Sequence, residues 1–186
     1  MAVLHITTPR MVLGAMTWVS SKDHRLMVRV NHWRPPKWLR LWMLAATRSG
    51  DGWLWYALGL VLALCGGPQR FRALLAATLA VVVGIVLFLE LKRAFRRPRP
   101  CTLEPHCWAD LLPPDQFSFP SGHTITAFAV MASLGGFYPE MLPGLLFCAV
   151  SIAASRVVLG MHFLSDVLAG AALGITLGAL AAALIR

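Results

Sequence analysis

Charged side chains are scarce in this chain of 186 residues. They make up 13% of it, against about 25% in an average soluble domain, while hydrophobic residues reach 58%. A soluble domain of this length has no means of hiding so much apolar surface from water, and a disordered chain is poor in apolar residues. Four cysteines are too few for a small disulfide framework. The composition therefore indicates an integral membrane protein of one domain.

Acidic residues are also few: 8 Asp and Glu stand against 17 Lys and Arg, for a net charge of +9. Such a balance suits nucleic acid, anionic lipid or a phosphorylated substrate. Eight basic residues lie in residues 1–50, and six more are those of Lys92–Arg99 and Arg156. Because the second group lies between hydrophobic segments, a nucleic-acid-binding arm is a poor interpretation. We expect no nucleic-acid partner.

Five hydrophobic segments predict membrane-spanning helices, since about 20 residues of helix cross the hydrocarbon layer. They are Trp53–Cys65, Ala73–Leu91, Thr124–Phe137, Leu142–Ser155 and Phe163–Leu184. Residues 93–122 contain six prolines, and loops of this length are usually functional. We expect an all-α fold, a polytopic transmembrane helix bundle whose core is residues 51–186 with an ordered loop at 93–122.

Residues 1–50 form a separate basic region in this prediction. Basic residues alternate with Trp and Leu over residues 24–48, a pattern typical of a helix lying in the membrane interface. Pro35 and Pro36 are expected to divide that helix in two. The alternative is a cryptic sixth transmembrane helix.

The first polar cluster is Lys92–Pro100, at the end of a predicted span. One interpretation is a set of cations that anchors the helix end at the interface. The other is an anion clamp, with Lys as a compact charge and Arg as a fork for phosphate oxygens. We expect Lys92 and Arg99 to bind the anion, because Pro98 and Pro100 restrict Arg99. Arg93 lies about 100° round the helix from Lys92 and is expected to point to lipid headgroups. Arg96 and Arg97 lie in the loop without a proline on each side, so all three are expected to contribute little.

The second cluster is Pro120-Ser121-Gly122-His123, just before a predicted helix. Ser121 or Thr124 is a candidate N-cap that satisfies free amides. The same helix start, with Gly122, also suits phosphate binding, because free amides and the helix dipole attract an anion. His123 is then placed to donate or accept a proton.

The third cluster contains Ser155, Arg156, Gly160, His162 and Asp166. His162 and Asp166 are four residues apart and would share one face of a helix. A carboxylate on one imidazole nitrogen leaves the other nucleophilic. Gly160 is expected to break the helix and bring Arg156 and His162 together. The alternative is a buried His–Asp pair with an interfacial Arg.

Successive spans alternate sides, so Lys92, His123, Arg156 and His162 are expected at one side of the membrane. Such a group of cations and histidines suits a phosphate passing through a charged transition state. Together the three motifs, Lys92-x6-Arg99-Pro100, Pro120–His123 and Ser155-Arg156-x5-His162-x3-Asp166, resemble the signatures of the type 2 phosphatidic acid phosphatase (lipid phosphate phosphatase) family. The resemblance covers about residues 50–186.

The resemblance implies metal-independent hydrolysis of a lipid phosphomonoester or diphosphate through a phosphohistidine, with no cofactor. By this resemblance His162 attacks phosphorus, Asp166 orients the His162 ring, and His123 protonates the leaving oxygen. The phosphoryl-binding residues it implies are Lys92, Arg99, Ser121, Gly122 and Arg156. The substrates that fit are polyprenyl diphosphate, phosphatidic acid, phosphatidylglycerol phosphate and lipid A phosphate. A lipid phosphotransferase and a non-catalytic lipid-phosphate carrier are the alternative functions.

Two further questions concern cysteines and orientation. Cys101, His106 and Cys107 allow a zinc site, a disulfide or free thiols, and free thiols are expected, with no metal. The basic residues of 1–50 favour a cytoplasmic active site by the positive-inside rule. The family resemblance favours the periplasmic face of a bacterial inner membrane, which is our expectation.

Overall fold

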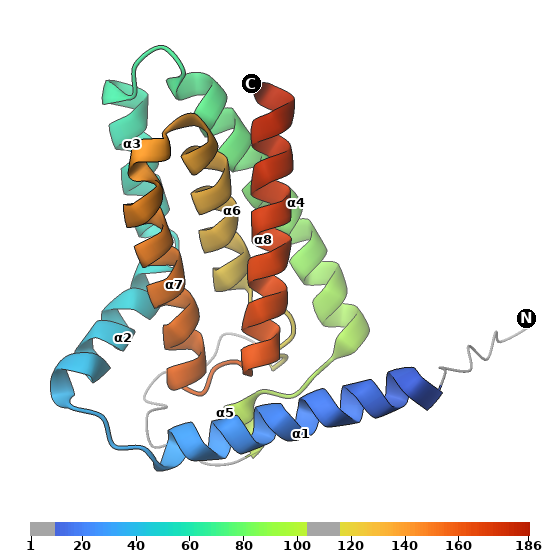
Figure 1. The fold of residues 1–186 in the computed structure, drawn as a ribbon. Coiled ribbons are helices and arrows are strands. Elements are labelled where there is room, and N and C mark those ends of the chain that lie inside the picture. The colour runs from blue at the N-terminus through green and yellow to red at the C-terminus, as the bar shows by residue number, and fades with distance from the viewer. Residues whose placement is uncertain (1–9, 104–115) are drawn as a thin grey trace, which may run out of the picture.

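The structure, a computed structural model, describes residues 10–103 and 116–186, and most of these residues are helical. The helices are α1 Arg10–His32, α2 Lys37–Ser49, α3 Trp53–Cys65, α4 Arg70–Phe95, α5 Pro100–Leu103, α6 Gly122–Phe137, α7 Leu142–Val158 and α8 Leu164–Ile185, with a 3-10 turn at Pro139–Met141 before α7. Helices α3, α4, α6, α7 and α8 run side by side as a bundle (Figure 1). The predicted all-α bundle is confirmed. Four of the five predicted hydrophobic segments lie within these helices, and the last, Phe163–Leu184, begins one residue before α8.

Three helical segments are long and apolar enough to cross a membrane, namely Arg70–Phe95, Pro139–Val158 and Leu164–Ile185. Helix α3 is apolar but shorter, with 13 residues. Helix α6 has 16 residues, most of them buried between its neighbours. By contrast, α4 exposes large apolar side chains such as Leu75, Leu79, Val82 and Val86. Because exposed aliphatic side chains of this kind are stable against lipid and costly in water, the bundle is built for a membrane.

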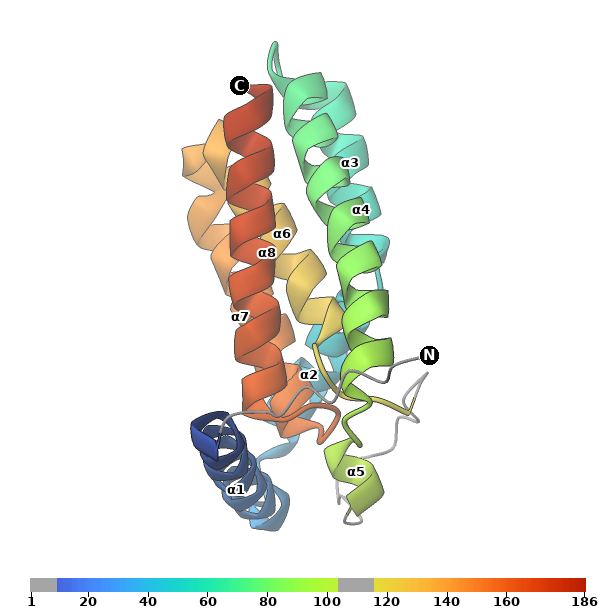
Figure 2. The same cartoon turned by 90° about the vertical axis from the view of Figure 1, so that its right-hand side faces the viewer.

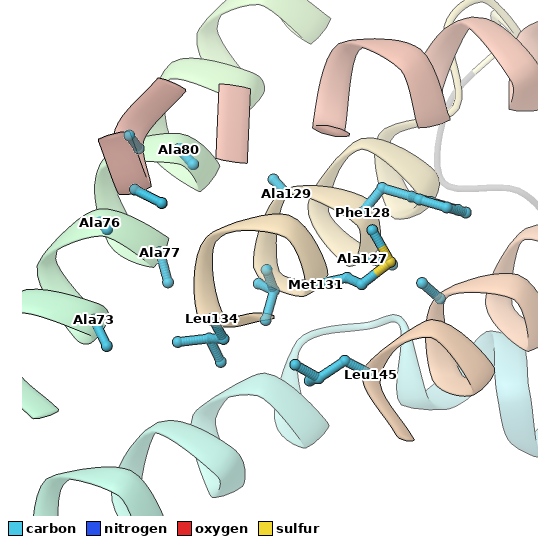
Figure 3. Packing of buried hydrophobic residues seen from close by; sticks show 14 of the residues in the cluster. Ala73, Ala76, Ala77, Ala80, Ala127, Phe128, Ala129, Met131, Leu134 and Leu145 are labelled. Atoms are coloured by element: carbon cyan, nitrogen blue, oxygen red, sulfur yellow. The ribbon is translucent and has the colours of Figure 1, made fainter. Parts of the chain in front are cut away.

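Small residues bring the central helices together. A Cβ atom on Gly174 would lie 2.5 Å from the Ile125 carbonyl oxygen, and one on Gly178 would lie 2.4 Å from that of Ala129. Contacts this short are available only to glycine, as at other close helix contacts in membranes. Buried alanines of α4, among them Ala73 and Ala77, lie on the side of that helix toward α6 (Figure 3). Helix α6 is therefore held between α4 and α8.

The two N-terminal helices pack against the outside of the bundle. Helix α1 ends at His32 and α2 begins at Lys37, so the break falls at Pro35 and Pro36, as predicted. Helix α1 lies across the end of the bundle where α4 ends and α8 begins (Figures 1 and 2). Helix α2 packs on α7, where the rings of Trp42 and Phe147 stack with centroids 5.8 Å apart. Thus α1 crosses the end of the bundle and does not run alongside its five helices, while an interfacial position of residues 1–50 stays a prediction.

Candidate active site

A cavity of about 350 Å³ lies at this end of the bundle. Its walls include Gly50, Asp51, Gly84, Ile85, Phe88, Lys92, Arg99, Gly122, His123, Ile125, Thr126, Arg156 and His162. Six of the eight site residues predicted from the sequence are therefore in its lining. The other two, Ser121 and Asp166, are fully buried beside it. Three motifs that are far apart in the chain thus meet in one place.

The turn between α7 and α8 carries His162. Gly160 has a φ of 67°, a conformation that costs glycine little, and it follows the end of α7 at Val158. The backbone amides of Met161 and His162 then both donate to the Arg156 carbonyl, at 3.1 and 3.0 Å. The predicted break at Gly160 is confirmed, and it brings Arg156 and His162 to the same cavity.

The relation between His162 and Asp166 differs from the one predicted. They do not share a helical face, because α8 begins at Leu164 and His162 precedes it. Asp166 instead closes the first turn of α8, where its Oδ2 accepts a 2.9 Å hydrogen bond from the Phe163 amide. The same oxygen lies 3.8 Å from Nδ1 of His162. His162 and Asp166 still lie close together, because residues four apart approach each other at the start of a helix as well as within it.

The other ring nitrogen of His162 faces Arg99. Nη1 of Arg99 lies 3.2 Å from Nε2 of His162 and 2.7 Å from the Met161 carbonyl oxygen. A guanidinium only donates hydrogen bonds, so Nε2 accepts in this contact. The proton of a neutral imidazole is then on Nδ1, which points toward Asp166.

Burial of His162 sets its protonation. Loss of solvation is the main cause that lowers the pKa of His162, to about 4, and the charges of Arg156 and Arg99 act in the same direction. The contact with Asp166 opposes this shift. At neutral pH the imidazole is therefore uncharged, the state in which Nε2 has a lone pair to offer.

His123 has a partner that the sequence motifs do not contain. Its Nε2 lies 2.8 Å from Oδ1 of Asp51, in the turn between α2 and α3. A carboxylate accepts hydrogen bonds, so the contact holds a proton on Nε2. The ring packs against Gly50, where a Cβ atom would lie 2.7 Å from Cδ2 of His123. The sequence feature that could have indicated this turn and its carboxylate is the Gly50-Asp51-Gly52 run before a hydrophobic segment.

Three buried cations line the cavity. Lys92, Arg99 and Arg156 have exposed fractions of 7%, 1% and 4%. Nζ of Lys92 lies 4.3 Å from the ring centroid of Phe88, and Nη1 of Arg156 donates to Oγ1 of Thr47 in α2. Buried cations need compensating groups or a ligand of opposite charge. The cavity is therefore suited to an anion.

The remaining arginines of the first cluster have other partners. Arg93 is exposed and pairs with Glu90 at 2.8 Å, and Arg96 donates from Nε to the Arg93 carbonyl. Arg97 is not in the cavity lining but contacts Asp166, with Nη1 2.7 Å from Oδ1 of that residue. Arg97 was expected to contribute little, because its position in the sequence does not reveal a partner 69 positions away.

The start of α6 departs in one detail from the prediction. Ser121 occupies the N-cap position but its side chain makes no capping hydrogen bond. Its Oγ accepts from Oγ1 of Thr124 at 2.9 Å, and its backbone amide donates to the Asp166 carbonyl at 3.2 Å. Thus Ser121 and Thr124 bond to each other rather than to helix amides, and Ser121 joins α6 to α8.

Among residues 10–103 and 116–186, no group of three or more His, Cys, Asp or Glu side chains is arranged to hold a metal ion. Cys101 is a free thiol. His106 and Cys107, the other members of the conjectured zinc site, lie outside the described residues.

Comparison with known proteins places this geometry in context. Residues 54–186 match the PAP2 superfamily. The decaprenylphosphoryl-5-phosphoribose phosphatase of Mycobacterium tuberculosis is 36% identical over 142 residues, which cover 74% of this chain and 78% of that protein. The crystal structure of LpxE from Aquifex aeolicus superposes with a TM-score of 0.72 at 31% identity, covering 84% of this chain and 92% of that one. The PAP2-type phosphatidylglycerolphosphate phosphatase of Bacillus subtilis also gives a TM-score of 0.72, at 27% identity, covering 90% and 86%.

Proposed function

Because this chain belongs to the PAP2 superfamily and is an integral membrane lipid phosphatase, we propose that it hydrolyses a lipid phosphomonoester or diphosphate through a phosphohistidine on His162. The observation that carries this proposal is that Nε2 of His162 has no proton and so has a lone pair for attack. It is an uncharged acceptor at the cavity wall, beside the buried guanidinium of Arg99.

The reaction has two steps. In the first, Nε2 of His162 attacks phosphorus and the bond to the lipid oxygen breaks. His123, as the imidazolium whose Nε2–H stays on Asp51, gives that oxygen the proton of Nδ1. In the second, water attacks the phosphohistidine, the P–N bond breaks, and inorganic phosphate leaves while His123 takes a proton from the water. Asp166 accepts from Nδ1–H as positive charge develops on the ring. The 3.8 Å separation would shorten in the substrate complex, as contacts of free enzymes often do.

The phosphoryl oxygens would be bound by the cations of the cavity. Lys92, Arg99 and Arg156 supply three positive charges around one anion, which favours a transition state with charge on its equatorial oxygens. The Gly122 amide at the start of α6 would add a donor, since helix starts attract phosphate. The Ser121 hydroxyl would be a second donor, since its oxygen accepts from Thr124 and its own proton is left to donate.

The lipid part of the substrate would lie along the apolar side of the cavity. Ile85 and Phe88 of α4 and Ile125 of α6 line it together with the polar groups, and the outward surface of α4 is apolar. Substrates related to those named for the relatives fit this division: a polyprenyl phosphate derivative, phosphatidylglycerol phosphate or a lipid A phosphate. Phosphatidic acid fits it equally.

The experiment is phosphate release from a panel of these lipid phosphates by the purified protein in detergent. We expect release from at least one, and its loss in His162→Ala. A transfer of the phosphoryl group to another lipid without phosphate release would indicate a phosphotransferase. Binding and movement of a lipid phosphate that persists in His162→Ala, with no release by the wild type, would indicate a carrier and overturn the proposal.

We further propose a location in a bacterial inner membrane with the active site on the periplasmic side. The relatives named above are bacterial proteins, and the family resemblance favours that side for lipid substrates of the outer leaflet. Labelling of a single exposed cysteine near the site, in whole cells, by a reagent that does not cross the inner membrane would test the orientation.

A further inference from the structure

Helix α1 contributes one buried carboxylate, although it lies outside the residues that match the superfamily. Asp23 is 6% exposed and accepts hydrogen bonds from three groups. Nη2 of Arg97 lies 2.8 Å from Oδ2, the Ser165 amide lies 3.2 Å from Oδ1, and the Ser165 hydroxyl donates to Oδ2. A buried carboxylate on an otherwise basic helix is costly unless it is paired, so its position is specific.

Arg97 joins Asp23 to the catalytic group. While Nη2 bonds to Asp23, Nη1 bonds to Oδ1 of Asp166 at 2.7 Å and to the Ser165 hydroxyl at 2.7 Å. The guanidinium also lies 4.1 Å from the ring centroid of Phe163. One rigid guanidinium therefore bridges two carboxylates, and its plane is fixed by four groups.

The two oxygens of Asp166 are consequently assigned to different partners. Oδ1 is occupied by Arg97, and Oδ2 accepts from the Phe163 amide and faces His162. Rotation of the carboxylate would break both sets of contacts. The plane of Arg97 thus sets the direction in which Asp166 presents Oδ2 to the imidazole.

The charge of this group matters as much as its geometry. Arg97 alone would neutralise Asp166 and weaken its attraction for a positive imidazole. With Asp23 present, two carboxylates share one guanidinium, and the group has a formal charge of −1. The field at Nδ1 of His162 therefore favours the positive charge that develops when Nε2 attacks phosphorus.

We propose that Asp23 is a positioning residue for the phosphoryl transfer, acting through Arg97 on Asp166, so that docked α1 completes the catalytic group. This inference rests on the proposed function of His162. The competing explanation is that Asp23 merely anchors α1 to the bundle, in which case its loss would lower stability and leave turnover unchanged.

The test compares Asp23→Asn with the matched control Glu90→Gln. Both changes remove one carboxylate that bonds to an arginine of the same cluster, but the Glu90–Arg93 pair is on the surface. We expect Asp23→Asn to lower kcat about tenfold with KM within about twofold, by analogy with outer-shell partners of metal-bound histidines, whose loss costs about 10–100-fold. Glu90→Gln should leave both constants near wild type, and Asp23→Glu should recover much of kcat.

A double-mutant cycle identifies the route. If Asp23 acts through Arg97, Asp23→Asn should cost little further kcat in an Arg97→Gln background. Should Asp23→Asn fail to fold, as thermal unfolding in detergent would show, Arg97→Lys is the second variant. Lysine keeps the positive charge but lacks the planar guanidinium that bonds to both carboxylates. We expect a similar loss of kcat.

Three results distinguish the proposals. Wild-type kcat in a folded Asp23→Asn protein, or in Arg97→Lys if that is the variant used, overturns the role of Asp23 and leaves the phosphatase proposal intact. Equal losses in Asp23→Asn and Glu90→Gln overturn it as well, because a diffuse charge effect is then sufficient. Absence of phosphate release by the wild-type protein overturns the proposed function itself.

Discussion

Nη1 of Arg99 lies 3.2 Å from Nε2 of His162, and this contact identifies the ring nitrogen that is available for attack. The same arginine is anchored by the Met161 carbonyl, so it is fixed with respect to the turn that carries His162. One residue thus keeps Nε2 deprotonated in the free protein and offers a positive charge to the incoming phosphoryl group. An anion that displaces Nε2 as the partner of Arg99 would be directly beside its nucleophile.

The first prediction concerns the nucleophile and its carboxylate. His162→Ala should abolish turnover, because no other nitrogen takes the position of Nε2. Asp166→Asn should leave a small residual rate, since loss of an orienting carboxylate costs about 10⁴-fold in a related triad. The measurement is phosphate release together with trapping of the phosphoenzyme by acid-free quench and peptide mapping. A phosphoryl group found on any residue other than His162 would contradict the assignment.

The second prediction separates two arginines of one cluster. Arg99→Ala should lower turnover about a hundredfold or more, since one well-placed transition-state donor contributes about 2.7–4 kcal/mol. Arg93→Ala should cost little, because Arg93 is exposed and paired with Glu90, and any loss should shrink at high salt. Steady-state rates at low and high salt check this. Equal damage from both changes at high salt would show that the cluster acts as a diffuse positive field.

The third prediction concerns Asp51, which the sequence analysis did not include. Asp51→Asn should reduce kcat about tenfold to a hundredfold, a part of the factor of about 10²–10⁴ that general acid–base catalysis contributes. The reason is that Asp51 accepts from Nε2–H of His123 and so favours the protonated ring. The loss should be smaller for substrates whose leaving group needs no protonation. A comparison of an alkyl phosphate with an aryl phosphate of low leaving-group pKa measures this. If both substrates lose the same factor, Asp51 only supports the fold of the α2–α3 turn.

The fourth prediction follows from the lowered pKa of His162. In the unfolded chain this histidine binds a proton near pH 6.5, whereas in the folded protein it does so only near pH 4. Between these values the unfolded state holds more protons, so the folded state loses stability as the pH falls from about 6.5 to about 4. Thermal unfolding in detergent should show this decline, and the decline should be smaller in His162→Gln. An identical pH dependence in the two proteins would contradict the shift.

The fifth prediction is that chelation leaves activity unchanged. Lys92, Arg99 and Arg156 already supply the positive charge that a metal ion would otherwise bring to the phosphoryl oxygens. Phosphate release should therefore be the same with and without excess EDTA. Loss of turnover that zinc or magnesium restores would overturn a metal-free reaction and direct attention to Cys101, His106 and Cys107.

The sequence was sufficient where short-range patterns decide the structure. Hydropathy located the five bundle helices, and Gly160 located the break before His162. It was insufficient where a single polar residue finds a distant partner: Asp23, Thr47 and Asp51 lie in residues 1–52, yet they bond to groups 72 to 142 positions away. Such contacts depend on how α1 and α2 dock, which no spacing reveals. The helical face shared by His162 and Asp166 was predicted wrongly because His162 was taken as helical, whereas α8 begins two residues after it, at Leu164.

The path of α8 has a consequence for experiments in cells. The helix begins beside His162 and carries the chain to the opposite end of the bundle, where Arg186 lies (Figure 1). Because α8 is long and apolar enough to cross a membrane, we expect the catalytic group and Arg186 to face opposite compartments. A reporter protein fused after Arg186, of a kind that matures only in the cytoplasm, would become fluorescent if phosphate is released into the periplasm and stay dark if it is released into the cytoplasm. One fusion thus reports the compartment in which the lipid loses its phosphate.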